Sequence, residues 1–551
     1  MRSVDLLIIN ANVITLDGAN RIAGSVAMKN GRIVGIWSQL DPPSNEVNIT
    51  AQTKVLNVEG ATVIPGFIET HNHILACAYL KGSVDCSSPK NTCIQDILHE
   101  IEKKRVTTPP GEWIQGHSYD DTSLAEKRHP TRMDLDQVAP HHPVYITHIS
   151  GHLAVANSKA LELAGIDDEQ FGENPHFGRD GLNRLNGVLY EAPAMTAIQA
   201  VLPVMDKDTF LQRLGEVSQD YVAQGITTNT DAGVWDEDSL NIMLEAAKSG
   251  IIPMRSQLML MHSMLTGQGI FSNYTASELD QKIQQLSNGR ARLDSAKLFQ
   301  DGSIQGLTGA LREPYYCNDD TCGELFYEQN ALNEEIASLH KRGFRIAIHG
   351  NGDRAIGSIL EGFKYALNES PRLDHRHRIE HVQMATREDL NKMAELNVAG
   401  SFFINHVYYW GKRHEQMFLG PERAKRISPL RDAVDRNLLI TLHSDCPVTP
   451  VSPLFLIWAA VNRQTREGDV LGPEQKIDVI TALRAMTIDG AILNFQAQTS
   501  GSIEFGKFAD VVVLDKDLTD VNPLEIKDIK VLYTIIDGEI KYENMNVEVW
   551  K

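Results

Sequence analysis

The stretch that decides the fold and the site is Val63-Ile64-Pro65-Gly66-Phe67-Ile68-Glu69-Thr70-His71-Asn72-His73. It is an apolar run that ends in two histidines one residue apart. Because side chains alternate along an extended chain, His71 and His73 point to the same side if the run is a strand. Two neighbouring imidazoles at a strand end predict a pair of metal ligands.

Histidine spacing alone is weak evidence, as a second pair in the chain illustrates. The chain holds 19 histidines in 551 residues, so chance gives roughly 0.7 His-x-His pairs. His375 and His377 form another such pair, in the arginine-rich stretch 372–378. That stretch precedes a strand candidate instead of ending one, and we interpret it as a solvated segment. The case for His71 and His73 therefore depends on residues further along the chain.

Length and composition set the protein class. A chain of 551 residues exceeds one compact core, so we expect a large domain and at least one smaller one. The hydrophobic (42%) and charged (23%) fractions are typical of globular proteins. The absence of a long apolar run or a secretory signal, together with six scattered cysteines, predicts a cytoplasmic protein with free thiols. The net charge of −20 argues against nucleic acid or an anionic membrane as partner.

Both ends of the chain have the pattern of short strands. Asn30-Gly31 separates the apolar runs 25–28 and 33–37, and Asp537-Gly538 separates 531–536 from 539–540. Such dipeptides between apolar runs predict β-hairpins. We expect residues 1–62 and 496–551 to meet in one small β-sandwich domain. The alternative is two separate hairpins packed on the surface of the central domain.

The middle of the chain, residues 63–495, alternates strands with helices, which predicts parallel βαβ units. The strand candidates are 63–68, 113–117, 144–149, 225–231, 254–259, 294–299, 345–349, 378–381, 398–403 and 438–445. The long, turn-rich span after the first candidate leads us to place 113–117 and 144–149 in an inserted subdomain of about residues 80–215. Eight strands remain, as a (β/α)8 TIM barrel requires. The expected fold class is therefore α/β.

Residues that can bind metal recur at the ends of these strands. The first strand ends in His71 and His73, the fourth contains Lys297, the fifth ends in His349, the sixth in His381 and the eighth in Asp445. The active site of a barrel lies at the C-terminal face of its strands. Four histidines, a lysine and an aspartate that converge there predict a two-metal site.

This arrangement resembles the amidohydrolase superfamily in its binuclear form. That form carries His-x-His on the first strand, Lys on the fourth, His on the fifth and sixth, and Asp on the eighth. The run 65–71 resembles the family's first-strand signature, and 501–514 resembles its return to the β domain. Residues 151–161 and 297–303 resemble the amidohydrolase 3 branch, which includes enzymes that hydrolyse N-substituted formamides, and residues 401–411 resemble that subgroup more than the branch at large. The resemblance spans nearly the whole chain.

The resemblance implies a metal-dependent hydrolase with two divalent ions. Two ions roughly 3.5–4 Å apart can hold a bridging hydroxide and polarise a carbonyl. We expect zinc, because imidazole and carboxylate suit it, although manganese, cobalt and iron accept the same ligands. In relatives the fourth-strand lysine takes up CO2 and its carbamate bridges both metals, which implies N-carboxylation of Lys297. Asp445 would take the proton of the nucleophilic water and deliver it to the leaving amine.

Six further residues are weaker candidates. We predict that His152 and His406 assist Asp445 in catalysis by orienting the carbonyl, and that Asp301, Gln305, Tyr408 and Trp410 bind substrate. For each, an ordinary loop or packing role is the alternative. Cys446, next to Asp445, predicts sensitivity to thiol reagents and not a nucleophilic role.

The predicted function is hydrolysis of a linear C–N amide bond in a small-molecule N-formyl or N-acyl amine with an apolar N-substituent. Hydrolysis of a cyclic amide or carbamate is the alternative on the same site. A deaminase is disfavoured, because such relatives usually hold one metal and lack the lysine that Lys297 supplies. The filled ligand positions argue against a metal-free regulatory protein on this scaffold. Relatives are often dimers, so the resemblance also implies a homodimer.

Overall fold

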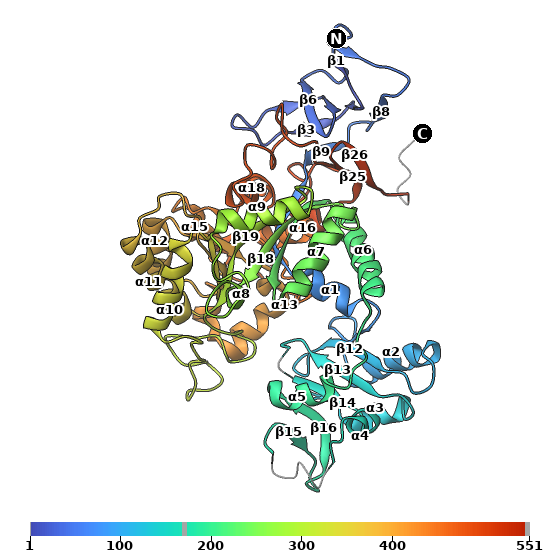
Figure 1. Cartoon of the computed structure of the whole chain (residues 1–551), viewed down its shortest axis with the longest axis vertical. Helices are drawn as coiled ribbons and strands as arrows, with labels where there is room; N and C mark the ends of the chain where they lie inside the picture. Colours follow the sequence, from blue (N-terminus) through green and yellow to red (C-terminus); the bar gives the residue numbers. More distant parts are fainter. Residues whose placement is uncertain (1, 152, 168–173, 546–551) are drawn as a thin grey trace. The chain divides into compact units, whose positions relative to one another are not determined.

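The computed structural model describes residues 2–151, 153–167 and 174–545 (Figure 1). The chain divides into two compact units, Met1–Leu75 with Leu214–Lys551, and Ala76–Arg213. The first unit contains the barrel and the strands of both chain ends, and the second is the insertion. No helix among the described residues is both long and apolar enough to cross a membrane.

Eight parallel strands form the nearly closed barrel of the first unit, and each strand is hydrogen-bonded to the next one along the chain. They are β10 (Phe67–Asn72), β17 (Ile226–Val234), β18 (Arg255–Met261), β19 (Ala291–Phe299), β20 (Ile346–Gly350), β21 (Arg378–His381), β22 (Ala399–Phe402) and β23 (Ile440–Leu442). The predicted (β/α)8 barrel is confirmed. Each of the eight expected barrel strands overlaps one of these elements.

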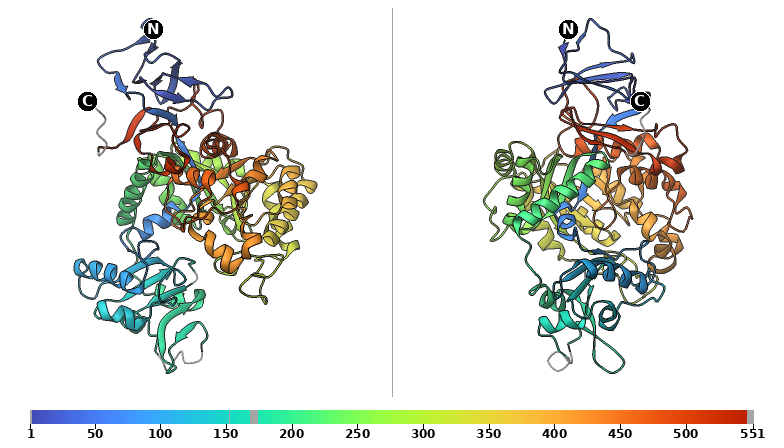
Figure 2. Two further views of the ribbon diagram at one scale, coloured as in Figure 1. Left: turned by 180° about the vertical axis from the view of Figure 1, so that it is seen from behind. Right: turned by 90° about the vertical axis from the view of Figure 1, so that its right-hand side faces the viewer.

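Helices connect the strands and lie on the outside of the barrel (Figure 2). They include α6 (Lys207–Ala223), α7 (Glu237–Ser249), α9 (Ala276–Leu286), α10 (Gln329–Lys341), α11 (Asp353–Glu369), α12 (Arg387–Leu396), α13 (Asn405–Arg413), α16 (Pro453–Asn462) and α18 (Ile488–Leu493). Several begin with a side-chain cap that satisfies the first free N–H groups. Asp236 caps α7 and Thr386 caps α12 in this way.

The first and last barrel strands meet at a seam beside the predicted metal ligands. The Asp445 N–H donates to the carbonyl oxygen of His71 at 3.2 Å, and the Thr70 hydroxyl lies 3.0 Å from the Thr441 hydroxyl. The three residues of β23, Ile440–Leu442, are all buried. The seam therefore brings the end of β10 and the residues after β23 together.

The predicted start of the first barrel strand, at residue 63, is wrong. Thr62–Pro65 form a separate strand, β9, which pairs with β3 and β24 in another sheet, and the barrel strand begins at Phe67. Gly66 separates the two strands, and its N–H donates to the carbonyl oxygen of Asp510. A Cβ at position 66 would lie 2.2 Å from the Thr227 hydroxyl oxygen, so the chain crosses between the sheets where only glycine fits.

Strands from both chain ends share one sheet in the first unit. The six-stranded sheet has the order β26 (Glu539–Glu543), β25 (Val531–Ile536), β24 (Val511–Leu514), β9, β3 (Asn12–Ile14) and β4 (Ile22–Ala23). A four-stranded sheet has the order β6 (Arg32–Trp37), β5 (Ser25–Lys29), β2 (Leu6–Ile9) and β8 (Lys54–Asn57). Buried residues of both sheets belong to one hydrophobic cluster. The two predicted hairpins are confirmed as β5–β6 and β25–β26, whereas the domain bounds stay a prediction.

The second unit has its own six-stranded sheet and two hydrophobic clusters. Its strands, in sheet order, are β11 (Val84–Asp85), β12 (Ile114–Tyr119), β13 (Val144–His148), β14 (Leu153–Ala156), β16 (Leu185–Tyr190) and β15 (Phe177–Arg179). Helices α2 (Ile94–Thr107), α3 (Arg132–Val138), α4 (Ser158–Leu163) and α5 (Glu191–Gln199) complete it. Its parallel strands β12 and β13 correspond to the two candidates that the sequence placed outside the barrel.

The interpretation of His375 and His377 as a solvated segment is wrong. Both side chains are buried, and the ring of His377 stacks on Phe363. His377 Nδ1 accepts the backbone N–H of Ile346, so its Nε2–H donates to His340 Nδ1 at 2.8 Å. Every nitrogen of the two rings has a partner, since His375 also accepts from the His377 N–H and donates to a backbone carbonyl. Such complete pairing allows imidazoles to be buried.

We expect the variant Gly66→Ala to be less stable than the wild type, because the added methyl group would overlap the side chain of Thr227. Overpacking of this kind typically costs about 1–3 kcal/mol. Calorimetry should show a lower melting temperature for this variant. The control is Gly18→Ala, where a Cβ meets nothing within 4 Å. Equal melting temperatures for the two variants would contradict the proposed role of Gly66.

Candidate metal centre

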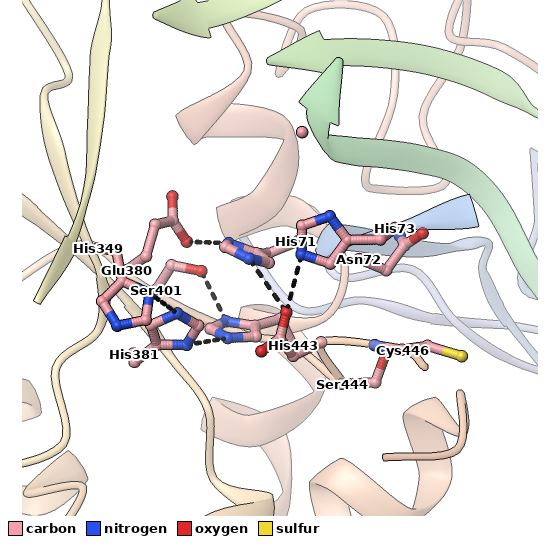
Figure 3. A network of polar contacts seen from close by, with 12 residues as sticks. His71, Asn72, His73, His349, Glu380, His381, Ser401, His443, Ser444 and Cys446 are labelled. Carbon is pink, nitrogen blue, oxygen red and sulfur yellow. Dashed lines mark hydrogen bonds and ion pairs between the residues drawn. The ribbon is translucent and has the colours of Figure 1, made fainter. Parts of the chain in front are cut away.

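The centre begins with three side chains from the barrel seam. His71 and His73 lie at the end of β10, and the Nε2 atom of each is 3.2 Å from Asp445 Oδ1 (Figure 3). His71 is buried, and the side chain of His73 is 25% exposed. These three groups could together hold one metal ion. The structure thus brings together three of the six ligands predicted from the sequence.

A second row of imidazoles lies next to the first. His349 Nδ1 is 3.0 Å from His381 Nε2, and His381 Nδ1 is 3.1 Å from His443 Nε2. The ring of His71 stacks on His443 with centroids 4.6 Å apart, and its centroid lies 5.1 Å from that of His381. His443 Nδ1 is in turn hydrogen-bonded to the hydroxyl of Ser401 at 2.9 Å. The histidines of four strand ends therefore form one cluster.

Lys297 lies inside the barrel wall, in β19. It is 1% exposed and pairs in register with Met261 on one side and Ala347 on the other. Burial lowers the pKa of Lys297 to about 8, against the opposing effects of Glu380 and Asp445. A substantial fraction of the amine is then neutral near physiological pH. A neutral amine can react with CO2, whereas an ammonium has no lone pair.

The backbone at two of these ligands is unusual. His381 has a φ of 71° and Asp445 a φ of 53°, in the left-handed region that non-glycine residues rarely adopt. Such conformations typically cost of order 1–3 kcal/mol each and cluster at functional sites. Here they occur where β21 and the segment after β23 turn to direct side chains to the centre.

The donor atoms fit a divalent cation. His71 Nδ1 lies 2.6 Å from Glu380 Oε2, which can only accept, so in the neutral ring Nδ1 carries the proton and Nε2 has a free lone pair. That lone pair faces Asp445 Oδ1, a buried oxygen that accepts no hydrogen bond from the described residues. Two acceptors that face each other at 3.2 Å are stabilised by a cation.

The charge states agree with this fit. Burial raises the pKa of Asp445, but hydrogen bonds and positive charge from His71 and His73 hold it well below its usual range, and a bound cation would replace those protons. Burial lowers the pKa of His349 to about 3 and that of His381 well below its usual range. An ionised carboxylate and neutral imidazoles are the forms that bind metal.

The predicted substrate ligand Asp301 occupies a buried position. Its carboxylate accepts backbone N–H groups from Ala310 at 2.9 Å, Asn351 at 3.0 Å and Gly352 at 2.7 Å. Burial raises the pKa of Asp301 to about 7 despite these hydrogen bonds. The carboxyl group thus ties the loop after β19 to the loop after β20, beside His349. Its contact with substrate stays a prediction.

The remaining candidates lie in different surroundings. His406 and Trp410 are buried in α13, where the His406 ring packs against Phe403 with centroids 4.3 Å apart. Tyr408, on the same helix, packs against Phe455 and Trp458 of α16. These helix contacts account for the position of Tyr408 without a substrate.

Two candidates remain. Gln305 is half-buried, and its Oε1 has no hydrogen-bond partner among the described residues. His152 lies outside the described residues. Their roles in binding and catalysis stay predictions.

Sequence reasoning missed Glu380, His443 and Ser401. A signal for His443 exists, because it lies two residues before Asp445 and directly follows β23. Glu380 directly precedes His381, so strand alternation directs it away from that ligand, and its partner His71 is distant in sequence. An exposed aromatic residue, Trp235, was also missed: it follows β17 and stacks on Phe299.

The sequence profile of the amidohydrolase family matches residues 54–542. The chain belongs to this family. An N-substituted formamide deformylase of Arthrobacter pascens is 31% identical over 98% of this chain and 98% of its own length. The protein LONG AFTER FAR-RED 3 of Arabidopsis thaliana is 28% identical over 98% of this chain and 91% of its own length. The resemblance predicted from the strand-end residues is thus confirmed for this amidohydrolase.

Solved structures support the same fold. The crystal structure of an uncharacterized metal-dependent hydrolase from Pyrococcus horikoshii OT3 has a TM-score of 0.73 and 22% identity to this chain. The match covers 94% of this chain and 99% of that one. The fold of this chain therefore also occurs in an experimentally determined structure.

We expect the variant His71→Ala to lose metal while keeping its fold, because it removes the imidazole that contacts both Asp445 and Glu380. Elemental analysis of protein purified without chelator should show less metal per chain, and turnover should fall at least 100-fold. The control is His99→Ala, an exposed residue of α2. Wild-type metal content in His71→Ala would remove His71 from the ligand set.

Proposed function

We propose that this amidohydrolase cleaves the linear C–N amide bond of N-formyl or N-acyl amines with an apolar N-substituent. The observation that carries the proposal is the convergence of two β10 imidazoles on Asp445, beside the buried Lys297. The 31% identity to an N-substituted formamide deformylase supports the substrate class. Its substrate partner would then be a small molecule, and we propose a homodimer from the resemblance.

Two divalent ions, which we propose to be zinc, would supply the Lewis acidity that activates water and polarises the amide carbonyl. The residues proposed to hold them are His71, His73, Lys297, His349, His381 and Asp445. All of these side chains except that of His73 are at least four-fifths buried. Burial excludes competing water ligands and strengthens each electrostatic interaction.

Asp445 is the proposed proton carrier. Its Oδ1 faces the imidazoles of His71 and His73, so the proton from water is accepted at Oδ2. As water adds to the carbonyl carbon and the C–N bond breaks, the same oxygen returns the proton to the leaving nitrogen. The products are formate, or another carboxylate, and an amine. The low pKa of this carboxyl keeps it ionised at neutral pH and able to begin the cycle.

Lys297 would complete the ligand set as a carbamate. Its neutral amine attacks CO2, and the nitrogen then loses a proton, which leaves an anionic carboxylate on the lysine. This converts a side chain that cannot bind metal when protonated into one with two oxygen donors. Lys297 pairs in register with β18 and β20, and from there it would present that carboxylate to the proposed metal ions.

An aromatic surface adjoins the proposed ligands. Trp235 is 58% exposed and stacks on Phe299 at 6.1 Å with an interplanar angle of 17°. The Phe299 ring lies 5.3 Å from that of His349. A Cβ on Gly233 would be 3.1 Å from the Trp235 indole nitrogen and 3.2 Å from His73 Nδ1. The pair therefore offers a flat apolar face next to both histidines, which suits an apolar N-substituent.

The reaction is tested with N-benzylformamide and the variant Lys297→Ala. The wild type should release benzylamine and formate, whereas the variant should lose at least one metal and most of its turnover. Propionate or another small carboxylate should restore part of both, because it replaces the carbamate. Unchanged metal content in the variant would exclude Lys297 as a ligand, and hydrolysis of cyclic amides alone would refute the linear substrate.

The aromatic surface is tested with Trp235→Ala. Loss of a stacked aromatic contact is worth about 0.5–1.5 kcal/mol, so kcat/KM for N-benzylformamide should fall about 2–13-fold. The value for N-methylformamide, which has no ring to stack, should barely change. Phe505→Ala, an exposed aromatic residue before β24, is the control. Equal losses for both substrates would contradict a role of Trp235 in substrate selection.

A further inference from the structure

A chain of buried charged side chains runs through the barrel and ends at the metal centre. It consists of Arg345, Asp294, Arg378 and Glu380, and we name it the ion column. Each of these four residues is at most 7% exposed. Barrel interiors are ordinarily filled by bulky apolar residues. Charges in such a place are rarely retained for stability alone, because their desolvation cost often exceeds the gain from pairing.

The contacts along the ion column are continuous. Arg345 pairs with one oxygen of Asp294, and Arg378 Nη2 lies 3.0 Å from the other. Arg378 Nε donates to Glu380 Oε1, and Glu380 Oε2 lies 2.6 Å from His71 Nδ1 (Figure 3). The column thus links β19 and β21 to the first ligand of β10.

The two oxygens of Glu380 serve two different partners. A guanidinium has donors only, so Arg378 requires an acceptor at Oε1. An ionised carboxylate also accepts at Oε2, so the proton of His71 must be on Nδ1. In the neutral ring, which is the form that binds metal, the other nitrogen, Nε2, then has no proton, and it is the atom that faces Asp445.

We propose that Glu380 is the positioning residue of the metal centre. Held as a carboxylate by Arg378, it fixes His71 in the tautomer that presents an unprotonated Nε2 to the metal. A carboxylate behind a metal-binding histidine orients the ring and raises its basicity. This inference rests on the proposed metal site. It explains why the ion column is present. The column ends at His71 Nδ1, and a proton on this atom leaves Nε2 free to bind metal.

The variant Glu380→Gln separates this role from a packing role. Glutamine has the same shape but one oxygen and one NH2 group. Because Arg378 offers only donors, the amide oxygen must face Arg378, and the NH2 group then faces His71 Nδ1. His71 would respond by accepting at Nδ1 and carrying its proton on Nε2, where it blocks the metal. The fold can persist while metal affinity falls.

The double variant Arg378→Met/Glu380→Gln should reverse much of this loss. Without the guanidinium, the amide oxygen is free to accept from His71 Nδ1. Asp294 keeps its partner Arg345 and the hydroxyl of Ser295. The double change removes one charge of each sign, so no isolated buried charge remains.

A matched control comes from another buried ion pair of the first unit. Arg255 Nε lies 2.7 Å from Asp510 Oδ2, and both residues are 8% exposed. Asp510→Asn breaks a pair of similar burial that has no contact with His71. It should lower the melting temperature without changing metal affinity.

The experiment is a zinc titration of the four metal-depleted proteins against a chromophoric chelator, with melting curves of the same samples. Loss of a residue that hydrogen-bonds a metal-binding side chain typically weakens metal binding about 10–100-fold. We expect this loss for Glu380→Gln, recovery to within about fivefold of wild type for the double variant, and wild-type affinity for Asp510→Asn. Wild-type protein that binds no zinc would refute the proposed function itself.

Two other results would overturn the inference alone. One is a wild type that binds zinc and a Glu380→Gln variant that binds it equally well. The other is a double variant as weak as Glu380→Gln, which would indicate a packing role. If Glu380→Gln does not fold, the zinc affinity of the charge-balanced double variant tests the inference. Zinc affinity near the wild-type value supports the inference, and affinity reduced tenfold or more contradicts it.

Discussion

The lone pairs that converge between β10 and β23 are the constraint on which the rest of this structure depends. The imidazole nitrogens of His71 and His73 lie 3.2 Å from one carboxylate oxygen of Asp445, in a place with little water to separate them. Without a cation there, only protons on the two imidazoles compensate this buried carboxylate in a low dielectric medium. The barrel therefore stabilises a geometry that becomes favourable when a cation is bound.

The architecture supports that geometry from several directions. The seam hydrogen bonds join β10 to the segment that carries Asp445, and the left-handed backbone of His381 and Asp445 directs both side chains inward. Parallel strands place their carboxyl ends at one face, so residues far apart in the sequence meet there. The strain and the buried charges lower stability locally, and the large apolar core of the barrel compensates for them.

Much of this arrangement can be predicted from the sequence, since each barrel strand has its own apolar run and the ligands lie at strand ends. The rest depends on contacts that the sequence does not encode locally. The need for glycine at position 66 comes from the side chain of Thr227, and the burial of His377 depends on hydrogen bonds to His340 and Ile346. Helical periodicity could not tell which neighbours Tyr408 contacts. Glu380 was missed because its partner comes from the other end of the barrel sequence.

The central claim is that this barrel binds divalent metal through its strand-end histidines and Asp445. The most direct test is the metal content of the wild-type protein, measured by elemental analysis after purification without chelator. The account predicts close to two divalent ions per chain, with zinc the most abundant. A value near one would exclude the binuclear centre and the bridging role of Lys297, and a metal-free protein that still hydrolyses amides would contradict the account altogether.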